Sequence, residues 1–304
     1  MSALLAILTY FAYVFIVTMY AVKAVKIARM PVHLRWELYP VIHETKRQYG
    51  ASYYEDLERW AKHRHQTVLR GVLFLLKENL CFGEYFHRNR GYWLVLLPWH
   101  LGFILIITFH VLCFGGALAQ ASGVSVSAES IGVGGMLYFL ILLTGVASFV
   151  SGSLGSVGLF IKRVCDKDLR AFATPQNYFN YLFTLMVFAS GLYAWYFVDP
   201  TLFEYRKFWT GLVTLSPARV ESPAAIHIIL FALFLIYLPF TRSLHYITKF
   251  FSYFWVRWDD QPNWRGSKSE RRLEEWLNQP VSWSAPHIPP GRTWAEIASD
   301  SKDY

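Results

Sequence analysis

The chain has 304 residues, of which 54% are hydrophobic and only 16% are charged, whereas about a quarter of a typical soluble domain is charged. This composition excludes a disordered chain, a collagen-like chain and a purely soluble enzyme. The three cysteines, Cys81, Cys113 and Cys165, lie far apart in the sequence, which excludes a disulfide scaffold and an internal iron–sulfur cluster. The net charge is +8. Such a charge on a soluble protein would suggest nucleic acid, but in so apolar a chain we expect no nucleic-acid partner.

Five apolar runs are long enough to cross a bilayer as helices, which takes about 20 residues. They cover 2–25, 93–116, 131–161, 177–198, and 223–244 or slightly beyond. The first run has no basic segment before it and no clear cleavage site, so we interpret it as a retained helix rather than a signal peptide. We therefore expect an all-α integral membrane protein built as a bundle of five transmembrane helices.

Lysine and arginine are distributed unequally between the connections. Thirteen lie in 23–92, four in 162–175 and nine from 242 onward, while 199–222 has three and 117–130 has none. Cytoplasmic connections carry the excess of basic residues. This rule predicts an N-terminus outside, with the long loop, the 162–175 connection and the C-terminal tail in the cytoplasm.

The chain is then expected to have four parts. These are a first transmembrane helix (1–26), a cytoplasmic amphipathic loop (27–92), a membrane core of four helices (93–248) and a cytoplasmic tail (249–304). Prolines in the tail argue against one long helix. Because its tryptophans are spaced regularly between the prolines, we expect the tail to bind a partner protein.

Four histidines fall inside the predicted spans: His100 and His110 in the second, His227 and His245 in the fifth. An ionisable residue at membrane depth is costly and indicates function. The two spans run in opposite directions, so His110 and His227 share an outer layer, and His100 and His245 share an inner one. At a rise of about 1.5 Å per residue, His100 and His110 lie about 15 Å apart along their helix, and His227 and His245 lie about 27 Å apart along theirs. Tilted helices can accommodate this difference.

Two layers of paired imidazoles suit two haem b groups, each held by two histidines. A zinc site would need several cysteine or carboxylate ligands nearby, and a proton relay would need Asp or Glu within the spans; the spans contain no Asp or Glu and a single cysteine, Cys113. We predict that His110 and His227 ligate the outer haem iron and that His100 and His245 ligate the inner one. Interhelical hydrogen bonding by single histidines remains the alternative.

Other residues of the spans have two interpretations each. Glycines at 102, 145, 152, 155 and 158 leave room either for close helix approach or for a flat porphyrin ring. Arg242 lies one turn before His245. It is expected to pair with a haem propionate or to anchor the membrane edge.

The span pattern and the histidine spacings of 10 and 18 residues resemble the gamma subunit of respiratory nitrate reductase, a dihaem cytochrome b that oxidises quinol. The segments MPVHLRWELYPVIHE, WDDQPN, PVSWSAPHI and TWAEIA look like the membrane cytochrome subunit of heterodisulfide-reductase-like complexes, including the sulfite-reductase-associated complexes of sulfate respiration. This resemblance implies a menaquinone site beside the outer haem and a location in the cell inner (cytoplasmic) membrane. It also implies a cytoplasmic iron–sulfur partner subunit of the heterodisulfide reductase type.

One feature departs from the nitrate reductase pattern. The resembled subunit has a basic residue near its outer quinone pocket, whereas 117–130 contains no Lys or Arg. The polar candidates there are Gln120, Glu129 and Ser130. Glu129 is a candidate acceptor of the quinol proton, provided that it lies within hydrogen-bond reach; a solvated loop carboxylate is the simpler alternative.

We therefore expect an electron-transfer subunit of a quinol-linked oxidoreductase complex, surrounded by membrane lipids. It would carry electrons between menaquinol and the iron–sulfur partner of an anaerobic respiratory complex, in a direction that the residues leave open. One alternative is a nitrate-reductase-type cytochrome with a molybdenum-enzyme partner. Another is a scaffold or transporter without haem, in which the histidines are structural.

Overall fold

The computed structural model describes residues 2–29, 68–241, 245, 247–248, 265–286 and 288–300. The chain divides into two compact units. The first comprises Met1–Met19 and Val72–Thr241, and the second comprises Tyr20–Gly71 and Arg242–Tyr304. We call them the membrane unit and the tail unit. The described residues form helices and no β-strand, apart from isolated bridges in the tail unit, so the predicted all-α class is confirmed for this part of the chain.

The helices follow the chain in this order: α1 (Ser2–Ala28), α2 (Val68–Cys81), α3 (Gly83–Arg88), α4 (Arg90–Ala121), α5 (Val133–Cys165), α6 (Lys167–Ala171), α7 (Pro175–Phe197), α8 (Phe203–Val213), α9 (Ser222–Tyr237), a short 3₁₀ helix (Leu238–Phe240), α11 (Lys268–Leu277) and α12 (Trp294–Ser299).

Four of these helices are long and apolar enough to cross a membrane. They are α1, α4, α5, and α9 with its 3₁₀ extension, Ser222–Phe240. They coincide with four of the five predicted spans. The remaining prediction, 177–198, falls on α7, which is 23 residues long. Because α7 carries many tyrosine and polar residues, it is less apolar than the other four, and its crossing of the membrane stays a prediction.

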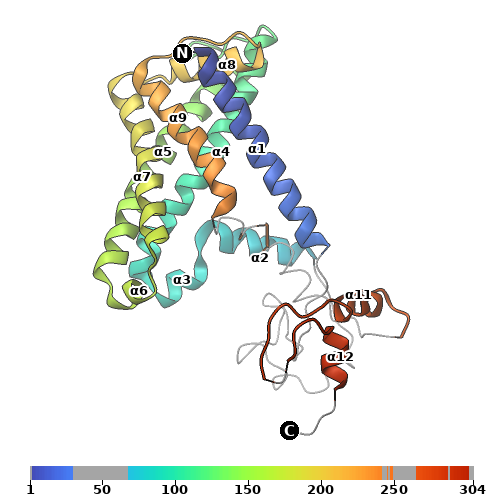
Figure 1. The fold of residues 1–304 in the computed structure, drawn as a ribbon. Coiled ribbons are helices and arrows are strands. Elements are labelled where there is room, and N and C mark those ends of the chain that lie inside the picture. The colour runs from blue at the N-terminus through green and yellow to red at the C-terminus, as the bar shows by residue number, and fades with distance from the viewer. Residues whose placement is uncertain are drawn as a thin grey trace. The chain divides into compact units, whose positions relative to one another are not determined.

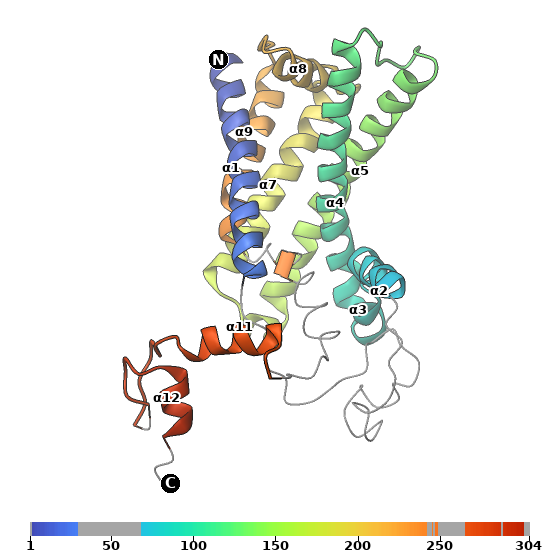
Figure 2. The same ribbon diagram turned by 90° about the vertical axis from the view of Figure 1, so that its right-hand side faces the viewer.

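The long helices of the membrane unit run side by side in alternating directions. The start of α1, the connection between α4 and α5, and α8 lie at one end, while α6 lies at the other (Figures 1 and 2). This alternation agrees with the predicted pattern, in which 117–130 and 199–222 share a side and 162–175 lies opposite. Which end faces outward stays a prediction from the basic residues.

Glycines bring α4 and α5 into close contact. A Cβ atom on Gly102 would lie 2.6 Å from Cα of Gly152, nearer than real side chains approach. Further along α5, a Cβ atom on Gly155 would collide with the backbone of Trp99, and one on Gly158 would lie 2.6 Å from Val95. Small residues allow such approach between membrane helices. Of the two interpretations of the glycine run, the structure therefore supports helix packing.

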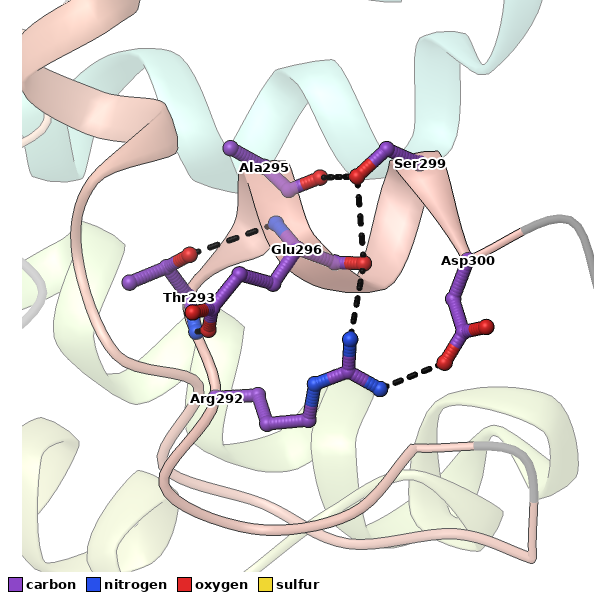
Figure 3. A network of polar contacts seen from close by, with 6 residues as sticks. All are labelled: Arg292, Thr293, Ala295, Glu296, Ser299 and Asp300. Carbon is purple, nitrogen blue, oxygen red and sulfur yellow. Dashed lines mark hydrogen bonds and ion pairs between the residues drawn. The ribbon is translucent and has the colours of Figure 1, made fainter.

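Within the described residues from 265 onward, the tail forms two short helices, α11 and α12, rather than one long one, as the prolines predict. Ser267 caps α11 by accepting a hydrogen bond from Glu270 N. Thr293 and Glu296 form a reciprocal capping box at the start of α12. Arg292 reaches along α12 to pair with Asp300, at 2.5 Å (Figure 3).

Candidate functional site

His110 on α4 and His227 on α9 are both deeply buried, with 5% and 1% of their surface exposed. Each contacts the ring of Tyr205 on α8, with ring centroids 5.8 Å apart in both cases. Each also contacts Phe231, at 4.0 Å from His110 and 6.3 Å from His227. The structure thus brings this predicted pair together in one layer of the membrane unit.

The hydrogen bonds of the two imidazoles define their tautomers. Nδ1 of His110 lies 2.7 Å from the carbonyl oxygen of Ile106 and therefore carries the proton. Nδ1 of His227 lies 3.1 Å from the carbonyl oxygen of Val187 and 3.1 Å from the Ser190 hydroxyl. A ligating histidine typically donates its second ring N–H to such an oxygen, which orients the ring. In both side chains Nδ1 carries the proton, so Nε2 has a free lone pair and can act as a neutral ligand.

The two Nε2 atoms differ in what surrounds them. Nε2 of His227 is buried and has no hydrogen-bond partner among the described residues. Nε2 of His110 accepts a hydrogen bond from the Tyr205 hydroxyl at 2.7 Å. An iron atom bound to His110 would replace that hydrogen bond. The arrangement fits a haem iron, which needs only two protein ligands.

A different kind of metal site finds little support in the same region. Within the described ranges, no group of three or more histidine, cysteine, aspartate or glutamate side chains could hold a metal ion. Structural zinc sites normally have four such ligands.

The inner predicted pair is only partly described. His100 lies on α4, half-buried, with its ring 4.6 Å from that of Phe82. His245 is helical and exposed, and belongs to the tail unit. The pairing of His100 with His245 therefore stays a prediction. Arg242, the predicted propionate partner, lies outside the described residues.

One end of the site is formed by α8, which lies within 199–222, a connection predicted to be an outward loop. The buried face of α8 is formed by Tyr205, Phe208, Trp209 and Leu212. Their spacing of three and four residues is the signal of an amphipathic helix, and it could have revealed α8 within the 199–222 connection. Asp199 supports the first turn, since its carboxylate accepts hydrogen bonds from Phe203 N and Glu204 N at 2.7 and 2.8 Å.

Arg206 on α8 is a buried basic residue that the sequence analysis did not single out. Its guanidinium lies 4.7 Å from the ring centroid of Tyr138 and donates a hydrogen bond to the carbonyl oxygen of Thr201 at 2.7 Å. Burial lowers the pKa of Arg206 from its ordinary value, while Tyr138 and Asp199 act in the opposite direction. This part of the membrane unit therefore contains a cation even though 117–130 has none.

A cavity of about 440 Å³ adjoins His110. Small-molecule sites typically have about 300–1,000 Å³ and mostly apolar walls. Its walls come from α1, α4, α8 and α9 and comprise Thr9, Tyr10, Tyr13, Ile107, His110, Val111, Phe114, Trp209, Leu212, Val213, Phe231 and Leu235. Glu129 is not among them; it is exposed in the turn between α4 and α5. The cavity has the size and the apolar character that a flat organic ring requires.

Comparison with known proteins places these features in a family. Residues 85–260, more than half of the chain, match the family model described as nitrate reductase gamma subunit. The matched range contains all four histidines of the predicted spans. No curated protein and no solved structure matches the chain. The chain therefore belongs to the nitrate reductase gamma subunit family, whose members are haem b-containing membrane cytochromes that transfer electrons within redox enzyme complexes.

Proposed function

We propose that this chain is a dihaem b subunit that transfers electrons between menaquinol, bound near the outer haem, and a cytoplasmic iron–sulfur partner. The observation that carries the proposal is the buried pair of His110 and His227, whose imidazoles are oriented by hydrogen bonds and of which His110 adjoins an apolar cavity. The complex would serve anaerobic respiration from the cytoplasmic membrane, with the N-terminus outside and five helices crossing the bilayer.

The four histidines would hold the two groups in layers. His110 and His227 would ligate the outer iron, and His100 and His245 the inner iron. Bound haem b supplies reversible one-electron chemistry between ferric and ferrous iron. The chain contributes the ligands, the Nδ1 hydrogen bonds that orient them, and an apolar surrounding that keeps water away. Arg242 is the proposed partner of a propionate on the inner side.

The cavity beside His110 is the proposed menaquinol pocket. Oxidation of one menaquinol releases two electrons and two protons, and the electrons leave singly toward the cytoplasmic partner. Release of the protons at the outer end would require an acceptor. Glu129 keeps this role as a proposal, and from its exposed turn it would receive protons through water rather than by direct contact with the cavity.

The electrons need an acceptor outside this chain. Its three cysteines lie far apart, so the chain cannot build an iron–sulfur cluster of its own. We propose a partner of the heterodisulfide reductase type, docked on the basic cytoplasmic segments and tail. A second candidate, a nitrate reductase complex with a molybdenum enzyme, is favoured by the family model itself.

Haem counting tests the proposal directly. The complex is purified from membranes, and its haem is quantified by the pyridine haemochrome method together with a reduced-minus-oxidised spectrum. We expect about two haem b per chain, and the loss of about one in each of the single variants His110→Ala, His227→Ala, His100→Ala and His245→Ala. His87→Ala, at an exposed position on α3, is the matched control and should keep both.

Two further results would decide between the alternatives. A folded but colourless preparation would overturn the redox proposal and favour a scaffold or transporter. A purified complex that contains molybdenum, in place of a subunit rich in iron–sulfur clusters, would assign the second candidate.

A further inference from the structure

The cavity beside His110 contains a hydroxyl that the protein leaves unsatisfied. Tyr13 on α1 lines the cavity, and its hydroxyl oxygen is buried without a hydrogen-bond partner in the described part of the chain. A buried hydroxyl in this state is unfavourable, because the loss of its hydrogen bonds to water is not compensated. A ligand oxygen placed beside it would recover that cost.

Three further hydrogen-bonding side chains of the cavity wall are engaged within the protein. Thr9 donates its hydroxyl to the carbonyl oxygen of Leu5 at 2.8 Å. Tyr10 donates its hydroxyl to the carbonyl oxygen of Leu212 at 2.5 Å. Both ring nitrogens of His110 have partners. Of Thr9, Tyr10, His110 and Tyr13, only Tyr13 therefore has a polar group left for a ligand in the cavity.

We infer that Tyr13 is a positioning residue for the quinone headgroup, with its hydroxyl hydrogen-bonded to one of the two ring oxygens. This inference rests on the proposed function and deepens it. A quinone suits the cavity because it is flat, neutral and apolar except for two oxygens. The hydrogen bond would fix the headgroup in the cavity whose wall includes His110.

The charge of the cavity wall argues against a carboxylate in the same place. Lysine and arginine are absent from the lining residues, and burying an unpaired anion in apolar surroundings is strongly unfavourable. A haem propionate would therefore be a poor partner for Tyr13. A lipid acyl chain could fill the volume, but it has no oxygen to meet the hydroxyl. A neutral quinone carries no charge that would need a basic partner, and it has an oxygen that can accept a hydrogen bond from Tyr13.

The route into the cavity is lateral. Ile107, Val111 and Phe114 on α4 line the cavity and are exposed on the surface of the membrane unit. Tyr10 on α1 is exposed as well. In a bilayer this surface faces lipid, so the headgroup can enter between α1 and α4 while its isoprenoid tail stays among the acyl chains.

A binding titration with the purified holo complex in lipid nanodiscs tests the inference. The ligand is a fluorescent hydroxyquinoline N-oxide, a quinol analogue whose emission is quenched on binding. Tyr13→Phe removes only the hydroxyl, so we expect roughly tenfold weaker binding and an unchanged haem spectrum. Tyr193→Phe on α7 is the matched control, because Tyr193 is exposed and is not a lining residue of the cavity; its affinity should equal that of the unmodified complex.

Each other outcome overturns the inference in a recognisable way. If Tyr13→Phe and the unmodified complex bind the analogue with equal affinity, Tyr13 does not hydrogen-bond the headgroup and the inference is wrong. The proposed function still stands in that case, provided that menaquinol still reduces the haems. A changed haem spectrum with unchanged affinity assigns the hydroxyl to the porphyrin instead. An unmodified complex that neither binds the analogue nor accepts electrons from menaquinol contradicts the inference and the proposed function together.

A second pair of variants tests the location without touching Tyr13. Val111 lines the cavity and is 64% exposed, while Leu143 on α5 is 65% exposed and is not a lining residue. Val111→Trp should fill the cavity and abolish binding of the analogue, and Leu143→Trp should leave binding unchanged. Unaltered binding in Val111→Trp would place the quinone elsewhere.

Discussion

The hydroxyl of Tyr205 lies 2.7 Å from Nε2 of His110, although 95 residues separate them in the chain. Because Nδ1 of His110 donates to Ile106, Nε2 is the acceptor and the tyrosine is the donor. The nitrogen that would bind iron is thus held by a hydrogen bond in the protein alone. Haem binding would exchange this hydrogen bond for an iron ligand.

Because haem binding would replace the Tyr205–His110 hydrogen bond, we expect Tyr205→Phe to affect the haem-free and the haem-loaded protein differently. The protein without haem should lose about 1–3 kcal/mol of stability, because Nε2 of His110 stays buried without a donor. The haem-loaded protein should keep its full haem content, since the iron takes the nitrogen. Thermal unfolding of both forms and haem quantification check this, with His110→Ala as the variant that loses haem. If Tyr205→Phe also loses haem, the hydroxyl supports ligation and does not compete with it.

Close packing of α4 against α5 predicts a strong position dependence for glycine substitutions on α4. Gly102→Ala would force a Cβ atom to within 2.6 Å of Gly152 Cα, and such overpacking costs about 1–3 kcal/mol. Gly115→Ala is the matched control, because a Cβ atom there meets nothing within 4 Å. Thermal unfolding in detergent should show a lower midpoint for the first variant and an unchanged or slightly higher one for the second. Equal midpoints would mean that the two helices can separate at no cost.

Asp199 caps α8, and α8 forms part of the cavity wall, so we expect the loss of this cap to weaken ligand binding in the cavity. Asp199→Ala removes the acceptor for two backbone N–H groups at the start of α8, which should cost about 2 kcal/mol. Since α8 contributes Trp209 to the cavity wall, affinity for the quinol analogue should also fall. Asp166→Ala, which uncaps α6 in the same way, should leave that affinity unchanged. A fall in affinity in both variants would show a general loss of structure.

The capping box of α12 predicts a pH dependence in the tail unit. Hydrogen bonding from Thr293 lowers the pKa of Glu296 below its usual range. A depressed carboxyl pKa contributes stability that is present above the ordinary value, about 4.3, and is lost as the pH falls toward the folded-state value. The protection of the amides of residues 294–300 against hydrogen exchange, measured relative to an unstructured chain at the same pH, should therefore fall on acidification through this range. Glu296→Gln should show lower protection at neutral pH and little further loss of protection with acid; a loss of protection with acid equal to that of the unmodified chain would contradict the assignment.

Much of the fold follows from local properties of the sequence. The length of an apolar run decides whether a helix can cross a bilayer, and four predicted spans are helices of this kind. The alternation of basic connections anticipated which connections share an end of the membrane unit. The depth of a histidine within its span is also local, so the sequence alone predicts that His110 and His227 lie in one layer. The run at 177–198 is less clear, because its tyrosines and polar residues weaken the apolar signal.

Tertiary structure alone decided the details of the site. The sequence could not show that α8 turns inward, since that depends on burying Tyr205 and Trp209 against distant helices. Nor could it show that Tyr13 on α1 shares a cavity with His110, because the two lie on different helices and meet only through packing. Hydropathy and charge act residue by residue along the chain, whereas a hydrogen bond across 95 residues or a cavity bounded by four helices depends on how side chains fit together in three dimensions.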